Sequence, residues 1–290
     1  MDLKNIKFDV IIIAGQSNAE GYGKSNDSLI TIIDDAYEAI DANECYVEVD
    51  PSLDFYDQAT IHMVYPPKVK IQPLQERSAG NRINAHLILL INDLNAFNKN
   101  INAFVSLYQK HCLDSERKVI VVKTAIGGTG FARKQQGYQT QLYYRTLMMV
   151  DYVLSLNKDN RVVAYLWHQG EHDAFEFPEK DYSQRYNDYK IEFLNQTRGV
   201  IEHFSTFTFP IITGGFIDDW RKDYEINCQA IEQALIDSCK ELGNGAFVSA
   251  KGLHSNKEDG LDEEDNIHFS KEALKELGIR YFEAFKSLNN

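Results

Sequence analysis

The feature that most constrains the fold is a set of five short apolar segments rich in β-branched residues. They lie at residues 8–13, 118–124, 161–167, 207–213 and 246–249. Most of them lack the polar alternation of a strand with one face in water, so we expect parallel strands buried on both faces. Segments with helical periodicity lie between them, which predicts an α/β fold: a three-layer αβα sandwich around a central five-stranded parallel sheet.

The segments between the expected strands predict helices. Helical spacing of apolar residues occurs within 81–97, 182–193, 224–242 and 270–288. The stretch 24–74 is loop-rich with short extended pieces, and we expect it to be an insertion that shapes the pocket of a single domain covering residues 1–290. Ligands of doubly wound sheets bind beyond the carboxyl ends of the strands, so catalytic residues should directly follow the apolar segments.

Charge and composition exclude several functions. The chain has 290 residues, 43% of them hydrophobic, and a net charge of −13, values suited to a globular protein that repels phosphate backbones. No stripe of Lys and Arg offsets that repulsion, so we expect no nucleic-acid partner, and the same charge favours neutral over polyanionic substrates. Neither a signal peptide nor an apolar stretch of membrane-spanning length is seen, which predicts a cytoplasmic protein without a membrane partner.

The four cysteines are expected to be reduced. Cys45, Cys112, Cys228 and Cys239 show neither a CxxC pair nor the spacing of zinc ligands. Cys228 and Cys239 fall on one predicted helix, where eleven residues separate them by roughly 16 Å along the axis, too far for a disulfide.

A candidate nucleophile follows the first apolar segment. That segment runs into AGQSNAEGYG, which places Ser17 in a turn after Gly15, at the carboxyl end of the expected strand. A nucleophile belongs there in a doubly wound sheet, although a serine in this position can also serve only as a helix cap. The GxSxG motif of α/β-hydrolases is absent, because Ala19 occupies the place of its second glycine.

The second and third segments end in groups that can stabilise a negative charge. TAIGGTG follows the second, and its Gly127 and Gly128 either direct backbone amides at a ligand or form a simple turn. WHQGEHD follows the third and supplies Gln169 as an amide donor and Glu171 and Asp173 as carboxylates.

The third motif also fits a zinc-peptidase pattern. His168, Glu171 and His172 match HxxEH, which requires a helix to bring both histidines to one face. The preceding RVVAYLW is strand-like and Gly170 interrupts the motif, so we expect no metal and no other cofactor. A zinc hydrolase remains an alternative to be excluded by activity in the presence of a chelator.

A candidate base lies just before the last predicted helix. DNIHFS places Asp265 three residues before His268, with Ser270 positioned to cap the helix. One tight turn would let the carboxylate hold the imidazole, which leaves the second ring nitrogen to accept a proton from Ser17. The acidic run 258–265 can equally be a solvated loop.

With these motifs in place, the sequence resembles the sialate O-acetylesterase-like branch of the SGNH hydrolases, which includes the family six carbohydrate esterases and the acetylxylan esterases. The motifs AGQSNAEG, AIGGTG, WHQGE and DNIHF are similar to its successive sequence blocks and span the chain from Ser17 to His268. The pairing of GQSN with HQGE is specific to this group. The resemblance implies a flavodoxin-like αβα fold and serine-dependent ester hydrolysis without a metal.

The resemblance also implies roles for individual residues. The oxyanion hole would consist of the Ser17 amide, the amide of Gly128 and the side chain of Gln169, which stands where most SGNH relatives have Asn. Asp265 is the first choice for the acid that supports His268. The other residues assigned to the site are Glu171, as a second acid able to reach His268, and Gln16, Asn18 and Trp167, as substrate-binding residues.

The expected function is a carbohydrate O-acetylesterase that works through an acetyl-enzyme intermediate. Its substrate would be an acetylated oligosaccharide, with acetylated xylo-oligosaccharides favoured over O-acetyl sialic acid. The alternative from another class is a catalytically silent glycan-binding module of the same fold, which Ser17→Ala would distinguish from an esterase. The sequence does not indicate an oligomeric state.

Overall fold

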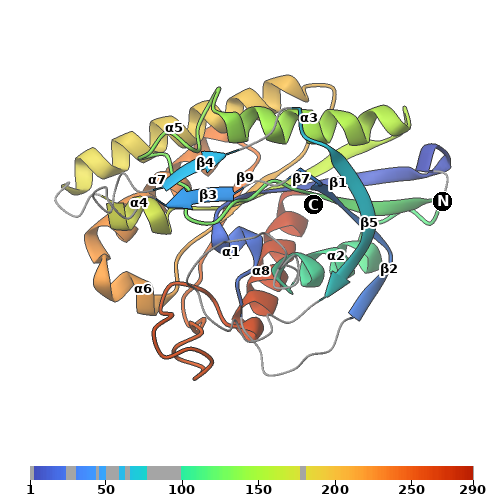
Figure 1. Ribbon diagram of the computed structural model, residues 1–290. Helices are drawn as coiled ribbons and strands as arrows, with labels where there is room; N and C mark the ends of the chain where they lie inside the picture. Colours follow the sequence, from blue (N-terminus) through green and yellow to red (C-terminus); the bar gives the residue numbers. More distant parts are fainter. Residues whose placement is uncertain are drawn as a thin grey trace.

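The five apolar segments form five adjacent strands of one sheet. In the computed structural model, which describes residues 3–23, 31–43, 46–49, 59–62, 66–76, 99–176 and 181–289, they are β1 (Lys7–Gly15), β6 (Arg117–Lys123), β7 (Arg161–His168), β8 (Ile211–Gly214) and β9 (Gly245–Val248). All neighbouring pairs among them are parallel, and the helices lie on both sides of the sheet (Figure 1). The predicted αβα class is confirmed.

The sheet has seven strands rather than the predicted five. β2 (Thr31–Asp41) joins it parallel to β6, and β5 (Val69–Glu76) pairs antiparallel with β2, giving the order β5-β2-β6-β1-β7-β8-β9. β2 lies within the stretch 24–74 and β5 begins in it, and the same stretch contributes the separate two-stranded sheet of β3 (Tyr46–Val49) and β4 (Ala59–His62).

Buried ion pairs explain why the sequence of β2 looked like a loop. The segment carries several acidic residues, among them Glu38, which is 4% exposed, and Asp41. Glu38 pairs with Lys123 at the end of β6, and Asp41 pairs with Arg145. The partners that neutralise these carboxylates come from distant parts of the chain, so the pattern of β2 alone does not indicate a buried strand.

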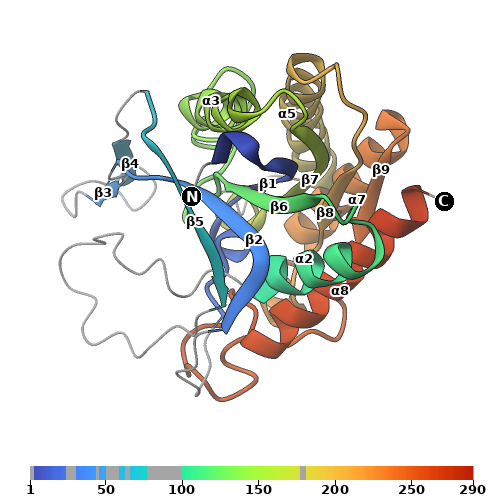
Figure 2. The ribbon, with the colours of Figure 1, turned by 90° about the vertical axis from the view of Figure 1, so that its right-hand side faces the viewer.

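The helices form two layers. α2 (Lys99–His111) and α8 (Lys271–Leu288) pack together on one face of the sheet, and α3 (Gln141–Leu156), α5 (Tyr182–His203) and α7 (Glu225–Leu242) cover the other (Figure 2). The shorter helices are η1 (Leu3–Asn5), α1 (Ser17–Glu20), α4 (Glu171–Glu176) and α6 (Asp218–Asp223).

Three of the four predicted helices are confirmed as α5, α7 and α8, and the predicted helix 81–97 lies outside the described residues. The Ser270 side chain caps α8 by accepting a hydrogen bond from the Ala273 amide. Cys112, Cys228 and Cys239 are free thiols. Among the helices of the described ranges, none is both long and apolar enough to cross a membrane.

The position of β1 matters most for function. Its residues Val10, Ile11 and Ile12 are fully buried, and burial of such side chains stabilises the fold by roughly 1.5–3 kcal/mol each. β6 lies on one side of β1 and β7 on the other, so the order of strands reverses at β1. The carboxyl end of β1 is therefore the switch point at which doubly wound sheets bind ligands.

Candidate active site

Ser17 stands at the switch point because the chain turns sharply at the end of β1. Gly15 has a φ of 130°, and a Cβ atom there would lie 2.0 Å from the carbonyl oxygen of His168, so only glycine fits. The Gln16 amide then donates to that same carbonyl at 3.0 Å. Ser17 follows as the first residue of α1 and is 5% exposed.

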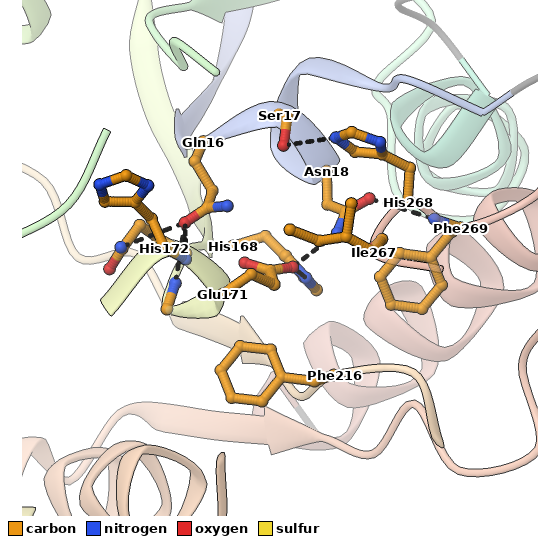
Figure 3. A network of polar contacts seen from close by, with 12 residues as sticks. Gln16, Ser17, Asn18, His168, Glu171, His172, Phe216, Ile267, His268 and Phe269 are labelled. Atoms are coloured by element: carbon orange, nitrogen blue, oxygen red, sulfur yellow. Dashed lines mark hydrogen bonds and ion pairs between the residues drawn. The ribbon is translucent and has the colours of Figure 1, made fainter. Parts of the chain in front are cut away.

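The structure brings Ser17, His268 and Asp265 into one chain of hydrogen bonds. His268 Nε2 lies 2.9 Å from Ser17 Oγ (Figure 3). On the other side of the ring, His268 Nδ1 lies 2.9 Å from Asp265 Oδ1, which also accepts from the His268 amide at 3.1 Å. The His268 side chain is 20% exposed, so solvent reaches the base. This geometry allows the imidazole to take a proton from the hydroxyl while the carboxylate holds its tautomer.

The surroundings keep Asp265 ionised. Burial raises the pKa of this carboxyl, but the hydrogen bonds and charge of His268 and the bond from Asn256 outweigh it, so the pKa is below its usual range. Asn256 Nδ2 donates to Asp265 Oδ2 at 2.8 Å. Tyr22 stacks on the His268 ring with a centroid distance of 5.1 Å, which further restricts the imidazole.

Glu171, the second acid considered for His268, lies elsewhere. It is 1% exposed, and within the described part of the chain its side-chain hydrogen bonds go to Asn18 and His168, none to His268. Burial raises the pKa of Glu171, but the neighbouring His168 and the bond from Asn18 outweigh burial and lower it. The carboxylate that contacts the base in this structure is therefore Asp265.

The two glycines after β6 differ in what their amides do. The Gly127 amide donates to Glu20 Oε2 at 2.7 Å, and a Cβ atom on Gly127 would lie 3.3 Å from Ser17 Cβ. Gly128 is exposed with a φ of 70°, and a Cβ there would have nothing within 4 Å. The Gly127 amide is thus already engaged, whereas the space around Gly128 is open.

Gln169, which we expected to face an oxyanion, points into the protein in this structure. Gln169 is fully buried, and its Nε2 donates to Gln16 Oε1 at 3.2 Å, to the Thr129 carbonyl at 3.3 Å and to Asp173. Its Oε1 accepts from the Tyr189 hydroxyl at 2.9 Å. The side chain turns inward because these buried partners engage both ends of its amide group, and its bonds join the loops after β1, β6 and β7.

The three residues expected to bind substrate are also buried. Trp167 is fully buried and stacks on Phe131 at 5.7 Å, because it points to the sheet face covered by α5. Gln16 is 1% exposed, and its Oε1 accepts from the amides of Gly170 and His172. Asn18 is fully buried. In this structure the three side chains face the interior of the protein, and their assignment as substrate-binding residues stays a prediction.

The residues of the zinc-peptidase pattern do not gather as ligands. His168 Nε2 bonds to Glu171 Oε1 at 3.1 Å, and His168 Nδ1 bonds to the Tyr281 hydroxyl at 3.0 Å, so both ring nitrogens are engaged inside the protein. Across the described ranges, no group of three or more His, Cys, Asp or Glu side chains is arranged to hold a metal ion.

Sequence reasoning missed two residues that shape the site. Asn256 holds the outer oxygen of Asp265, and Glu20 fixes the Gly127 amide. Glu20 lies within the AGQSNAEG motif, so its position next to Ser17 was a usable signal. Asn256 lies in a loop whose path only the folded chain reveals.

The doubly wound sheet, with Ser17 and His268 bonded to each other at its switch point, is the arrangement expected of a serine hydrolase. The sequence profile described as "Carbohydrate esterase, sialic acid-specific acetylesterase" matches residues 7–287. The chain therefore belongs to this family of carbohydrate esterases, and the resemblance drawn from the motifs is confirmed.

Known structures agree on the fold. NanS superposes with a TM-score of 0.66 at 16% identity, covering 97% of each chain. A protein from Arabidopsis thaliana gives 0.62 at 17% identity, covering 96% of this chain and 98% of its own. A carbohydrate acetylesterase from Xanthomonas citri gives 0.54 at 12% identity, covering 97% of this chain and 56% of its own. No curated protein matches the sequence.

Proposed function

We propose that the chain hydrolyses acetyl esters on sugar hydroxyls, with Ser17 as nucleophile and His268 as base. Ser17 Oγ attacks the acetyl carbonyl while its proton passes to His268 Nε2. The imidazolium then protonates the departing sugar oxygen, which leaves an acetyl group on Ser17. Water, deprotonated by the same imidazole, releases acetate and restores the serine.

One observation carries this proposal: the hydrogen-bonded line from Ser17 through His268 to Asp265 at the switch point of the sheet. In the proposed reaction, the Ser17 and Gly128 amides stabilise the negative oxygen of each tetrahedral intermediate. We leave Gln169 out of this proposed oxyanion hole because its side-chain amide bonds within the protein.

For the substrate we propose neutral acetylated xylo-oligosaccharides. A chain with a net charge of −13 disfavours the approach of an anionic sugar. O-acetyl sialic acid is the second candidate, because the family's description names sialic acid. Acetate released from the two substrates, assayed side by side, decides between them.

The experiment that tests the esterase function is acetate release by the purified protein and by its Ser17→Ala variant. Loss of the nucleophile of such a catalytic unit lowers kcat on the order of 10⁶-fold. The wild type should release acetate and Ser17→Ala should not, with both folded equally well. Absence of acetate release by the wild type, with binding of the acetylated sugar retained, would favour the glycan-binding module, and equal acetate release by both proteins would show that Ser17 is not the nucleophile.

A further inference from the structure

The side chain of Asn18 links the helix of the nucleophile to the loop of the base. Asn18 directly follows Ser17 and is fully buried. Its Nδ2 donates to the Ile267 carbonyl at 3.0 Å, and its Oδ1 accepts from the Phe269 amide at 3.2 Å. These two bonds hold the backbone immediately before and immediately after His268 (Figure 3).

This arrangement resembles the pairing of a parallel strand. In such a pair, one residue donates to the carbonyl before its neighbour and accepts from the amide after it. The amide group of Asn18 makes the same two contacts across His268. The distance between Ser17 and His268 is therefore set by one short side chain rather than by the long chain that separates them in sequence.

Glu171 fixes the orientation of the Asn18 amide. Asn18 Nδ2 donates its second hydrogen to Glu171 Oε1 at 2.6 Å. A flipped Asn18 would direct its oxygen at two acceptors, the Ile267 carbonyl and the Glu171 carboxylate, so only one orientation satisfies the network. The other carboxylate oxygen of Glu171, Oε2, is buried and has no hydrogen-bond partner among the described residues.

We propose that Asn18 is a positioning residue that holds His268 at hydrogen-bond distance from Ser17, and that Glu171 acts on the base only through Asn18. The proposal rests on the esterase function proposed above. In this proposal, Asp265 alone supports the charge of the imidazole directly. Glu171 contributes only by accepting the hydrogen bond that orients the Asn18 amide.

The first experiment compares Asn18→Ala with Asn160→Ala. Asn160 is a matched control, because it is 3% exposed and also bridges two backbone groups, accepting from the Phe8 amide at 2.7 Å and donating to the Val153 carbonyl at 2.8 Å. It lies at the amino end of β1, away from Ser17. Both variants lose a buried side chain that joins two segments.

We expect Asn18→Ala to lower kcat by about 10²-fold with KM nearly unchanged, since a small misplacement of a catalytic group has that effect. Asn160→Ala should lose thermal stability and keep its kcat per folded molecule. If Asn18→Ala does not fold, Asn18→Ser is measured in its place, with the rate of Ser17 phosphonylation by a fluorophosphonate as a second readout. A kcat and labelling rate equal to the control's would overturn the proposal.

The second experiment separates the two roles of Glu171. Glu171→Gln keeps an oxygen acceptor for Asn18, and its new amide nitrogen can stand where Oε2 makes no bond. We expect kcat to stay within about tenfold of wild type, with an unchanged pH profile, whereas loss of the carboxylate that supports the histidine costs on the order of 10⁴-fold. A loss of that size in Glu171→Gln would show that Glu171 supports the imidazole directly.

These outcomes separate the two proposals. If the wild type releases no acetate and its Ser17 is not labelled, the esterase function fails, and the positioning role fails with it. If the wild type and Asn18→Ala are equally active, only the positioning role is overturned.

Discussion

The two ends of β1 carry polar clusters of opposite character. At the amino end, Asp9 is fully buried and its carboxylate accepts bonds from Tyr108, Arg117 and Arg161 at 2.7, 2.6 and 2.7 Å. At the carboxyl end, Ser17 and His268 bond to each other at 2.9 Å, and the base is partly open to solvent. One strand thus joins a closed cluster to an open one.

The cluster around Asp9 stabilises the fold, whereas the groups at the carboxyl end of β1 can react with a substrate. Every oxygen of Asp9 is engaged by a charged or hydroxyl donor, so the cluster has nothing left for a ligand. At the opposite end, the buried amides of Gln16, Asn18 and Gln169 make comparable internal bonds, while the base His268 stays partly open to solvent. Mutations at the two ends should therefore affect different measured quantities.

Asp265→Asn should produce the largest effect at the open end. Replacing the carboxylate that holds the histidine tautomer lowers kcat on the order of 10⁴-fold in comparable sites, while the fold is retained. Steady-state acetate release, with the melting temperature as a control, measures this. A decrease of less than tenfold would mean that another group supports His268.

Asp9→Ala should produce the largest effect on stability. It leaves Arg117, whose side chain is 10% exposed, without its buried carboxylate, and breaking such a pair costs about 3–5 kcal/mol. Urea unfolding monitored by circular dichroism measures the loss. At temperatures where the variant is folded, its kcat should equal that of the wild type, and a reduced kcat would show that the two ends are coupled.

Gln169→Ala tests whether position or bonding decides the effect of a mutation. Gln169 lies near Ser17, at the carboxyl end of the sheet, but its side chain bonds only to buried groups of the protein among the described residues. Its removal takes one hydrogen bond from Asp173 and one from Gln16, which both keep other donors, at a cost of about 0.5–1.5 kcal/mol per lost bond in the free energy of unfolding. Chemical denaturation checks this value. An unchanged stability combined with a strong loss of kcat would instead restore Gln169 as an oxyanion donor.

The smallest effect on stability is expected from lowering the pH. Burial raises the pKa of Asp9, but the bonds from Arg161, Tyr108 and Arg117 outweigh it and lower that pKa below 3.8. Because the folded-state pKa is depressed, this stabilisation is present above the unfolded value and is lost as pH falls through the folded one. Below about pH 4 the wild type should lose stability more steeply than Asp9→Asn. Parallel slopes in acid denaturation would argue against an ionised Asp9.

The strands that the sequence predicted correctly contain an uninterrupted apolar run. β1, β6 and β7 each have at least four consecutive apolar residues, so the buried charges Asp9 and Lys123 near their ends do not hide the pattern, and the order of these strands along the chain indicates where Ser17 lies. β2 escaped prediction because its acidic residues are neutralised by Lys123 and Arg145, which are far away in sequence.

The same limit applies to the site. Ser17, His268 and Asp265 could be placed together because strand ends and a three-residue spacing imply where they lie. The direction of a side chain next to them could not be inferred. Gln169, Asn18 and Trp167 are in the expected loops or strand ends but point inward, since the hydrogen-bond partners or aromatic neighbours that turn them come from other segments.

The most direct test of the account is covalent labelling of the nucleophile. The protein is treated with a fluorophosphonate, digested and mapped by mass spectrometry, in parallel with its His268→Ala variant. We expect a single phosphonylated site at Ser17 in the wild type and a strongly reduced rate of labelling without the imidazole. Modification at another residue, or equal labelling of Ser17 in both proteins, would contradict a nucleophile activated by His268.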